Sequence, residues 1–116
     1  MSKQKPGSAH LPAGRVLDLA DLVEYGEGAI VSRTLVERGT GSVTLFAFDA
    51  GQGLSEHTAP FDALVQVIEG EGELVIGGKG HHVSTGKVVL MPANVPHAVK
   101  ATKKFKMLLT MLREKR

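Results

Sequence analysis

The sequence predicts an all-β domain, a sandwich or a barrel of short strands. Fourteen glycines and five prolines are spread along the 116 residues, which is typical of many short elements joined by turns. Runs of β-branched and other apolar residues recur between them at roughly the 8–12-residue spacing of strands in all-β folds. Hydrophobic residues make up 42% of the chain, which is enough for one domain with one core.

From residue 30 onward, glycine or proline separates the successive strand-like runs. Gly39 and Gly41 break the chain after the first run, Pro60 bends or ends the third, and Gly70 stops the fourth. The glycine-rich residues 77–80 predict a hairpin turn. The expected strands are residues 30–36, 42–48, 54–58, 63–68, 71–76, 81–84, 88–91, 95–101 and 105–112.

Residues 1–28 are predicted to lie outside this domain as a tail and an arm. Residues 1–14 have the character of a loose terminus. Leu17, Leu19 and Leu22 stand among acidic residues and predict a short helical turn or an extended arm. The single barrel domain is then expected over residues 29–116.

Composition and charge exclude several classes of function. The net charge is only +2, aromatic residues make up 4%, and no basic helix is visible, so we expect no nucleic-acid binding. The chain has no cysteine, so any metal must be held by histidine, carboxylate or amide groups. No stretch has the apolar length of a membrane span or the apolar core of a signal peptide, which predicts a cytoplasmic protein without membrane contact.

Two histidines, His57 and His97, carry the most specific signal. Each stands in a pattern marked by glycine and proline, and alternation along a strand gives each a direction. His97 is expected on the apolar face with Val99, opposite Lys100, and His57 on the face of Ser55. Both are therefore expected to point into one interior. The residues that mark the two patterns are Gly51, His57 and Gly70 in the first, and Gly86, Pro92 and His97 in the second.

The order and spacing of these two patterns resemble the two signature motifs of the cupin family. The resemblance covers most of the chain, from about residue 30 to residue 112. It implies a double-stranded β-helix, or jelly-roll barrel of the RmlC-like type, with a pocket for a small ligand inside the barrel. It also implies a homodimer, since proteins of this family are often dimeric.

The sequence departs from the metal-binding members of the family at two positions. Similar proteins hold iron, manganese, nickel, zinc or copper with three histidines and a glutamate, and here Ala59 and Ala63 stand where the second histidine and the glutamate are usual. The resemblance thus implies only His57 and His97 as ligands of a divalent iron, manganese, nickel or zinc ion, or no metal at all. Asp62 is the nearest carboxylate, and with the two histidines it would resemble the face that suits ferrous iron.

The alternative to a binding role is that the two histidines have a structural role. A buried imidazole needs partners for both nitrogens, and His57 and His97 can find them in each other, in water or in the backbone. Ser55 near His57 is a poor candidate for a catalytic triad because no acidic residue orients the pair.

Bulky apolar residues are expected to line the ligand pocket. The alternative is that they simply fill the core. Residues 105–112 form a strand that is apolar on both faces, with Leu108 and Leu112 opposite the methionines. A strand of this kind must be covered on both faces, which independently predicts a homodimer. The expected pocket residues are Phe46, Phe61, Met91 and Met107, together with His57 and His97.

Two functions are compatible with the sequence. The first is a binding module whose interior holds a small organic ligand, with or without a weakly held divalent metal at His57 and His97. The second is a metal-dependent enzyme of the dioxygenase, isomerase or decarboxylase type in the same pocket, or a metal-free one in which a histidine acts as acid or base. The missing ligands at Ala59 and Ala63 favour the binding module, but the sequence does not decide whether the protein is an enzyme.

Overall fold

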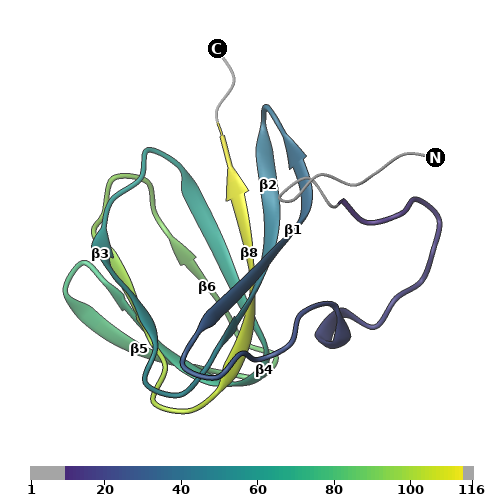
Figure 1. The fold of residues 1–116 in the computed structure, drawn as a ribbon. Coiled ribbons are helices and arrows are strands. Elements are labelled where there is room, and N and C mark those ends of the chain that lie inside the picture. Colours follow the sequence, from purple (N-terminus) through teal and green to yellow (C-terminus); the bar gives the residue numbers. More distant parts are fainter. Residues whose placement is uncertain (1–9, 114–116) are drawn as a thin grey trace.

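The computed structural model describes residues 10–113, which form eight antiparallel strands and one short 3₁₀ helix. The strands curl around a common interior (Figure 1). The elements are η1 (Leu19–Leu22), β1 (Ile30–Arg38), β2 (Gly41–Phe48), β3 (Gly53–His57), β4 (Asp62–Ile76), β5 (Lys79–Ser84), β6 (Val88–Met91), β7 (His97–Lys100) and β8 (Phe105–Leu112).

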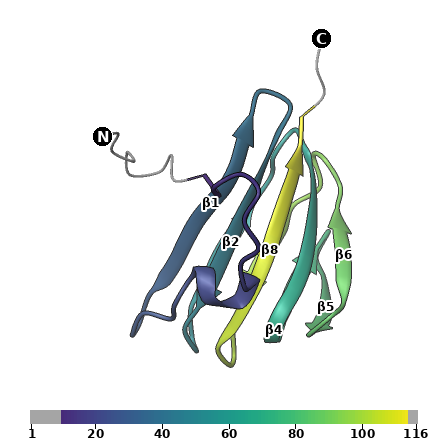
Figure 2. The same cartoon turned by 90° about the vertical axis from the view of Figure 1, so that its right-hand side faces the viewer.

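The strands form two layers that share β4. The first sheet has the order β1-β2-β8-β4-β6, and Figure 2 shows its outer face. The second sheet has the order β3-β7-β4-β5. An all-β jelly-roll barrel, as the sequence predicts, is therefore the fold of the described residues.

The strand β4 corrects one expectation from the sequence. Gly70 was expected to end a strand, but β4 continues through it and passes from the first sheet to the second. Gly70 has a positive φ of 78°, and a Cβ on Gly72 would collide with the ring of Phe105. Glycine is therefore required here for a bend in the strand and a close approach, and not for a turn.

The main core lies between the two sheets. Phe48 and Phe105 stack there with ring centroids 4.8 Å apart and an interplanar angle of 6°. Both rings are fully buried, as are Val65 and Val67 of β4 and Leu74, which follows them on the part of β4 in the second sheet. This packing fills the space between the two sheets.

A second apolar cluster lies outside the barrel, on the outer face of the first sheet. The segment 11–25 crosses this face (Figure 2), and its side chains pack on Leu45, Ala47 and Leu108. This contact covers Leu108, which the sequence analysis had assigned to a dimer interface, whereas Leu112 remains 55% exposed. The expected tail of residues 1–14 falls largely on residues 1–9, which lie outside the described residues.

Polar contacts attach the same segment to β8 and β4. The Lys106 side chain, only 7% exposed as a residue, donates a hydrogen bond to the backbone oxygen of Ala20 over 2.6 Å. The Tyr25 hydroxyl donates to the Glu69 carboxylate over 2.7 Å. Burial and, next, this hydrogen bond raise the pKa of Tyr25 well above its usual value. No helix within residues 10–113 is both long enough and apolar enough to pass through a membrane.

Candidate functional site

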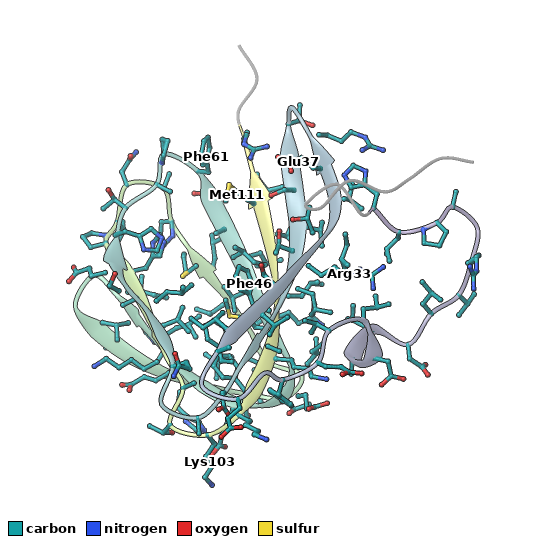
Figure 3. All side chains as sticks on the ribbon, in the orientation of Figure 1. Arg33, Glu37, Phe46, Phe61, Lys103 and Met111 are labelled. Atoms are coloured by element: carbon teal, nitrogen blue, oxygen red, sulfur yellow. The ribbon has the colours of Figure 1, made fainter. Side chains whose placement is uncertain are left out.

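The candidate site is a cavity of about 70 Å³ toward one end of the barrel. Both sheets contribute to its wall, and Figure 3 shows Phe61 and Met111 near this end, with Phe46 lower in the barrel. Except for the two imidazole rings, the lining side chains are aliphatic, aromatic or thioether groups. They are Leu54, His57, Ala59, Phe61, Ala63, Met91, His97, Val99, Met107, Leu109 and Met111.

A β-bulge in β3 turns His57 toward this cavity. Leu54 pairs with Val99 of β7, but the next pair is His57 with His97, so β3 contains one residue more than its partner. The extra residue moves His57 to the face of Leu54. The expectation that His57 shares a face with Ser55 is therefore wrong, because simple alternation does not hold across a bulge. His97 and Val99 do share the inner face, as expected, because β7 is regular.

The two histidines meet edge to face at the mouth of the cavity. Their Nε2 atoms are 3.2 Å apart, and the rings are inclined at 71° with centroids separated by 4.4 Å. His97 is 5% exposed, whereas His57 is open to solvent. Ring atom Nδ1 of His57 lies 2.9 Å from the backbone oxygen of Ser55, and Nδ1 of His97 lies 3.1 Å from that of Val95.

These contacts assign the tautomer of each ring. A carbonyl oxygen only accepts hydrogen bonds, so each Nδ1 must carry the hydrogen, which leaves a lone pair on each Nε2 in the neutral ring. The two Nε2 atoms of His57 and His97 are close enough for a water molecule, a shared proton or a cation to contact both. Metal-binding histidines commonly have this arrangement, in which the backbone holds one nitrogen and leaves the other free.

The separation of the two Nε2 atoms also suits ligands of one ion. Metal–imidazole bonds of about 2.0–2.1 Å to both atoms would enclose an angle of about 100° at the metal. Both rings could therefore bind a single ion through Nε2, as neighbouring ligands.

Asp62 does not join the histidines. It lies beside the inward-facing Ala63 on β4, so its side chain points to the other face, where Oδ1 accepts a hydrogen bond from the backbone nitrogen of Ala93 over 2.8 Å. Within residues 10–113, no group of three or more histidine, cysteine or acidic side chains is placed to hold a metal. The set of His57, His97 and Asp62 is therefore not assembled in this structure.

Most of the other expected pocket residues do line the cavity. Phe61, Met91 and Met107 are in its wall, but Phe46 is not; it stacks on Phe48 at a centroid distance of 5.8 Å. Met111 also lines the cavity, because it lies four residues after Met107 on β8 and so shares its face. Ala59 and Ala63, at the positions of the absent family ligands, are also in the wall.

The model of the cupin domain matches residues 36–112, which is more than half of the chain. The chain belongs to the cupin family. None of the curated proteins matches it. The family match and the jelly-roll fold of this cupin are those that its two motifs predict. The two motif histidines face the interior of the barrel.

Solved structures extend this comparison. A conserved protein of unknown function from Streptococcus pyogenes is 34% identical, with a TM-score of 0.87 over 100% of this chain and 98% of its own. A cupin 2 conserved barrel domain protein from Leptotrichia buccalis is 45% identical, with a TM-score of 0.81 over 84% of this chain; this chain spans about half (47%) of its length. A salicylate 1,2-dioxygenase from Pseudaminobacter salicylatoxidans is 19% identical, with a TM-score of 0.66 over 71% of this chain and 26% of its own, and shares the fold alone.

Proposed function

We propose that this cupin binds a small organic ligand in the barrel cavity, with the His57–His97 pair as the polar anchor. The observation that carries the proposal is an apolar cavity with two imidazoles in its wall whose Nε2 atoms are 3.2 Å apart. Ligand sites are typically of this kind, apolar with a few convergent polar groups that fix orientation. The ligand is then expected to have an apolar body and one hydroxyl or carboxyl group.

The size of the cavity restricts the ligand further. A volume of about 70 Å³ holds only about five water molecules, at roughly one probe sphere for each. A larger ligand must displace side chains, and the three methionines of the wall are the most adaptable apolar side chains for this. A short-chain acid or alcohol, or the end of a longer molecule that enters past His57, fits these limits.

We also propose that the His57–His97 pair binds a divalent metal beside the organic ligand. His57 and His97 would hold it through Nε2, and water or the ligand would complete its coordination. With only two protein ligands, we expect it to be held weakly. When bound, such an ion supplies Lewis acidity to an oxygen of the ligand. The histidines hold and orient this ligand oxygen, and the apolar wall limits the water around it.

A metal-dependent enzyme is the second candidate, and the placement of the two Nε2 atoms as neighbouring ligands favours it. The shared fold with the dioxygenase does not decide the matter, because one fold supports many functions. Elemental analysis of untagged, chelator-free protein distinguishes the candidates. Near-stoichiometric metal that a His57→Ala/His97→Ala variant lacks would favour the enzyme.

Ligand binding is tested by NMR with a library of short-chain hydroxy acids, carboxylic acids and alcohols. We expect shifts of the methionine methyl signals and of the two imidazoles, and their loss in His97→Ala. His82→Ala is the matched control, because His82 is exposed, pairs with Glu71 at 3.2 Å and lies outside the cavity. Shifts that persist in His97→Ala, or a library without any effect, would contradict the proposal.

We further propose that the protein forms a homodimer through an apolar patch of four exposed residues, Leu64, Val88, Leu90 and Leu112, here called the β4–β6 patch. Leu64 and Leu90 are directly paired across the two strands. The four members are uncharged, and the carboxylate of Asp62, which lies opposite Leu112 on the same face, is bound to the backbone nitrogen of Ala93. Within residues 10–113, the outer side of β6 has no partner strand, which leaves a backbone edge beside the patch.

A further inference from the structure

The sulfur of this chain is concentrated in the wall of the cavity. Three of the four methionines of the chain, Met91, Met107 and Met111, line it together with the two histidines. Thioether sulfur is a soft, uncharged metal ligand, and it favours soft ions such as Cu(I) over hard divalent ions. Thioether sulfur and the two imidazole nitrogens can therefore serve together as ligands of one metal ion.

The sheet register places two of these methionines on either side of Ala63. Ala63 pairs with Met91 of β6 on one side and with Met111 of β8 on the other. Residues directly opposite one another in adjacent strands point to the same face, so the three side chains form a row across β6, β4 and β8. Ala63 is the small member of this row, and both thioethers can reach the space over its methyl group.

This row lies where metal-binding cupins carry their carboxylate. Ala63 stands at the position of the usual glutamate, and within residues 10–113 no acidic side chain replaces it. The oxygen donor that a divalent ion prefers is absent from the wall, and two sulfur donors flank its place. The cavity thus lacks the oxygen ligand of the family's divalent site and has soft thioether ligands in its place.

The absence of negative charge among these ligands favours a monovalent ion over a divalent one. Two neutral imidazoles and a thioether bring no negative charge, so the full charge of a bound ion would lie in an apolar wall. The cost of transferring an ion from water to such surroundings grows with the square of its charge, so a monovalent ion is far less costly than a divalent one.

The histidine geometry leaves room for a third ligand. Two-coordinate Cu(I) prefers nearly linear coordination, whereas the 3.2 Å between the Nε2 atoms of His57 and His97 gives an angle of about 100° for bonds of about 2.0–2.1 Å. Such a bent pair leaves one side of the ion open. The cavity lies on the inner side of the pair, where the methionines are.

We propose that this cavity is a Cu(I) site, held by Nε2 of His57, Nε2 of His97 and the thioether of Met91 or Met111. The inference rests on the proposed function in using the same cavity and histidine pair, and it replaces the weakly held divalent ion with a soft monovalent one. Met107 lies four residues before Met111 on β8, roughly 13 Å along the strand, and is therefore outside the row at Ala63 to which the proposal assigns the thioether ligand.

The test is an anaerobic titration of the purified full chain with Cu(I) in competition with bicinchoninate. The expected result is one Cu(I) per chain. A Met91→Leu/Met111→Leu variant should bind at least about 10–100-fold more weakly, since loss of a direct ligand costs no less than loss of a supporting partner. His97→Ala should lose binding, whereas His82→Ala, outside the cavity, should retain it.

Two further measurements locate the sulfur. The X-ray absorption spectrum of the Cu(I) protein should contain a sulfur shell that is lost in the double methionine variant and kept in Met107→Leu. Titration with Zn²⁺ should give weaker binding that does not depend on Met91 and Met111. Thermal unfolding of each variant without metal checks that it is folded.

The proposal would be overturned by wild-type protein that does not compete for Cu(I), or by equal Cu(I) affinity in the wild type and a folded Met91→Leu/Met111→Leu variant. Loss of the sulfur shell in Met107→Leu would also reject this ligand set. Organic ligand binding is followed separately by NMR without metal, so failure of the Cu(I) site and failure of the ligand pocket are distinguishable.

Discussion

Leu54 and His57 face the same cavity although three positions separate them along β3, an odd interval that would place them on opposite faces of a regular strand. The bulge between them adds the residue that restores the common direction. It also brings His57 opposite His97, so the meeting of the two imidazoles depends on this one irregularity.

Restoring the missing family ligands should create a strong divalent site. In an Ala59→His/Ala63→Glu variant, four donors would face one cavity instead of two, because both alanines are already in its wall. We expect binding of Ni²⁺ or Zn²⁺ to change from weak to near-stoichiometric, measured by isothermal titration calorimetry. Ser55→His is the matched control, since the bulge turns this position away from the cavity. A folded double variant without gained affinity would show that the site is not placed as described.

Gly72→Ala should destabilise the barrel strongly. A Cβ at this position would press on the ring of Phe105, which cannot move away because Phe48 stacks on it at 4.8 Å. Overpacking of this kind costs about 1–3 kcal/mol, and we expect about 3 kcal/mol less free energy of unfolding in urea. Gly39→Ala, where a Cβ meets nothing within 4 Å, should change it by less than about 0.5 kcal/mol. Similar losses at both positions would argue against the close approach at Gly72.

Tyr25 should make stability depend on alkaline pH. Burial raises the pKa of its hydroxyl in the folded state, so the unfolded chain releases this proton first as the pH rises. The stabilisation is therefore complete below about pH 10, the ordinary tyrosine pKa, and is lost progressively above it. We expect the melting temperature of the wild type to fall more steeply than that of Tyr25→Phe between pH 9.5 and about 11.5. Parallel curves for the two proteins would mean that Tyr25 is exposed in solution.

Replacing the centre of the β4–β6 patch should separate the proposed dimer. A Leu64→Ser/Leu90→Ser variant removes two directly paired apolar side chains from the surface without touching the cavity wall. Size-exclusion chromatography with light scattering should give twice the chain mass for the wild type and the chain mass for the variant at micromolar concentration. Val16→Ser, which changes a fully exposed apolar residue on the N-terminal segment, should remain dimeric. A monomeric wild type would reject the interface.

Much of the fold was predictable from the sequence because strand patterns are local. The expected runs correspond to the observed strands, and they differ chiefly at Gly70, where the sequence favours a break and the structure has a bend. The preference of glycine for positive φ is a local property, whereas the Phe105 ring over Gly72 comes from a distant part of the chain. Only the folded barrel distinguishes a bend within a strand from the end of one.

The candidate site was predictable in part. The motifs around His57 and His97 identified both imidazoles, and regular alternation gave the correct face for His97. The position of Asp62 at the start of β4 did not reveal that it would bind the backbone of Ala93. Phe46 had the right size for the pocket, but it stacks on Phe48 instead.

By itself, the sequence predicted an all-β domain, because strand alternation and turn residues are encoded along the chain, and the resemblance of its two motifs predicted the cupin family, the jelly-roll fold and the two histidines. The tertiary structure decided what these residues meet. The bulge in β3 brought His57 to His97, and the register of β6, β4 and β8 placed Met91 and Met111 around Ala63. Such contacts depend on the pairing of strands that are distant in the chain, and one inserted residue changes the face of every side chain beyond it.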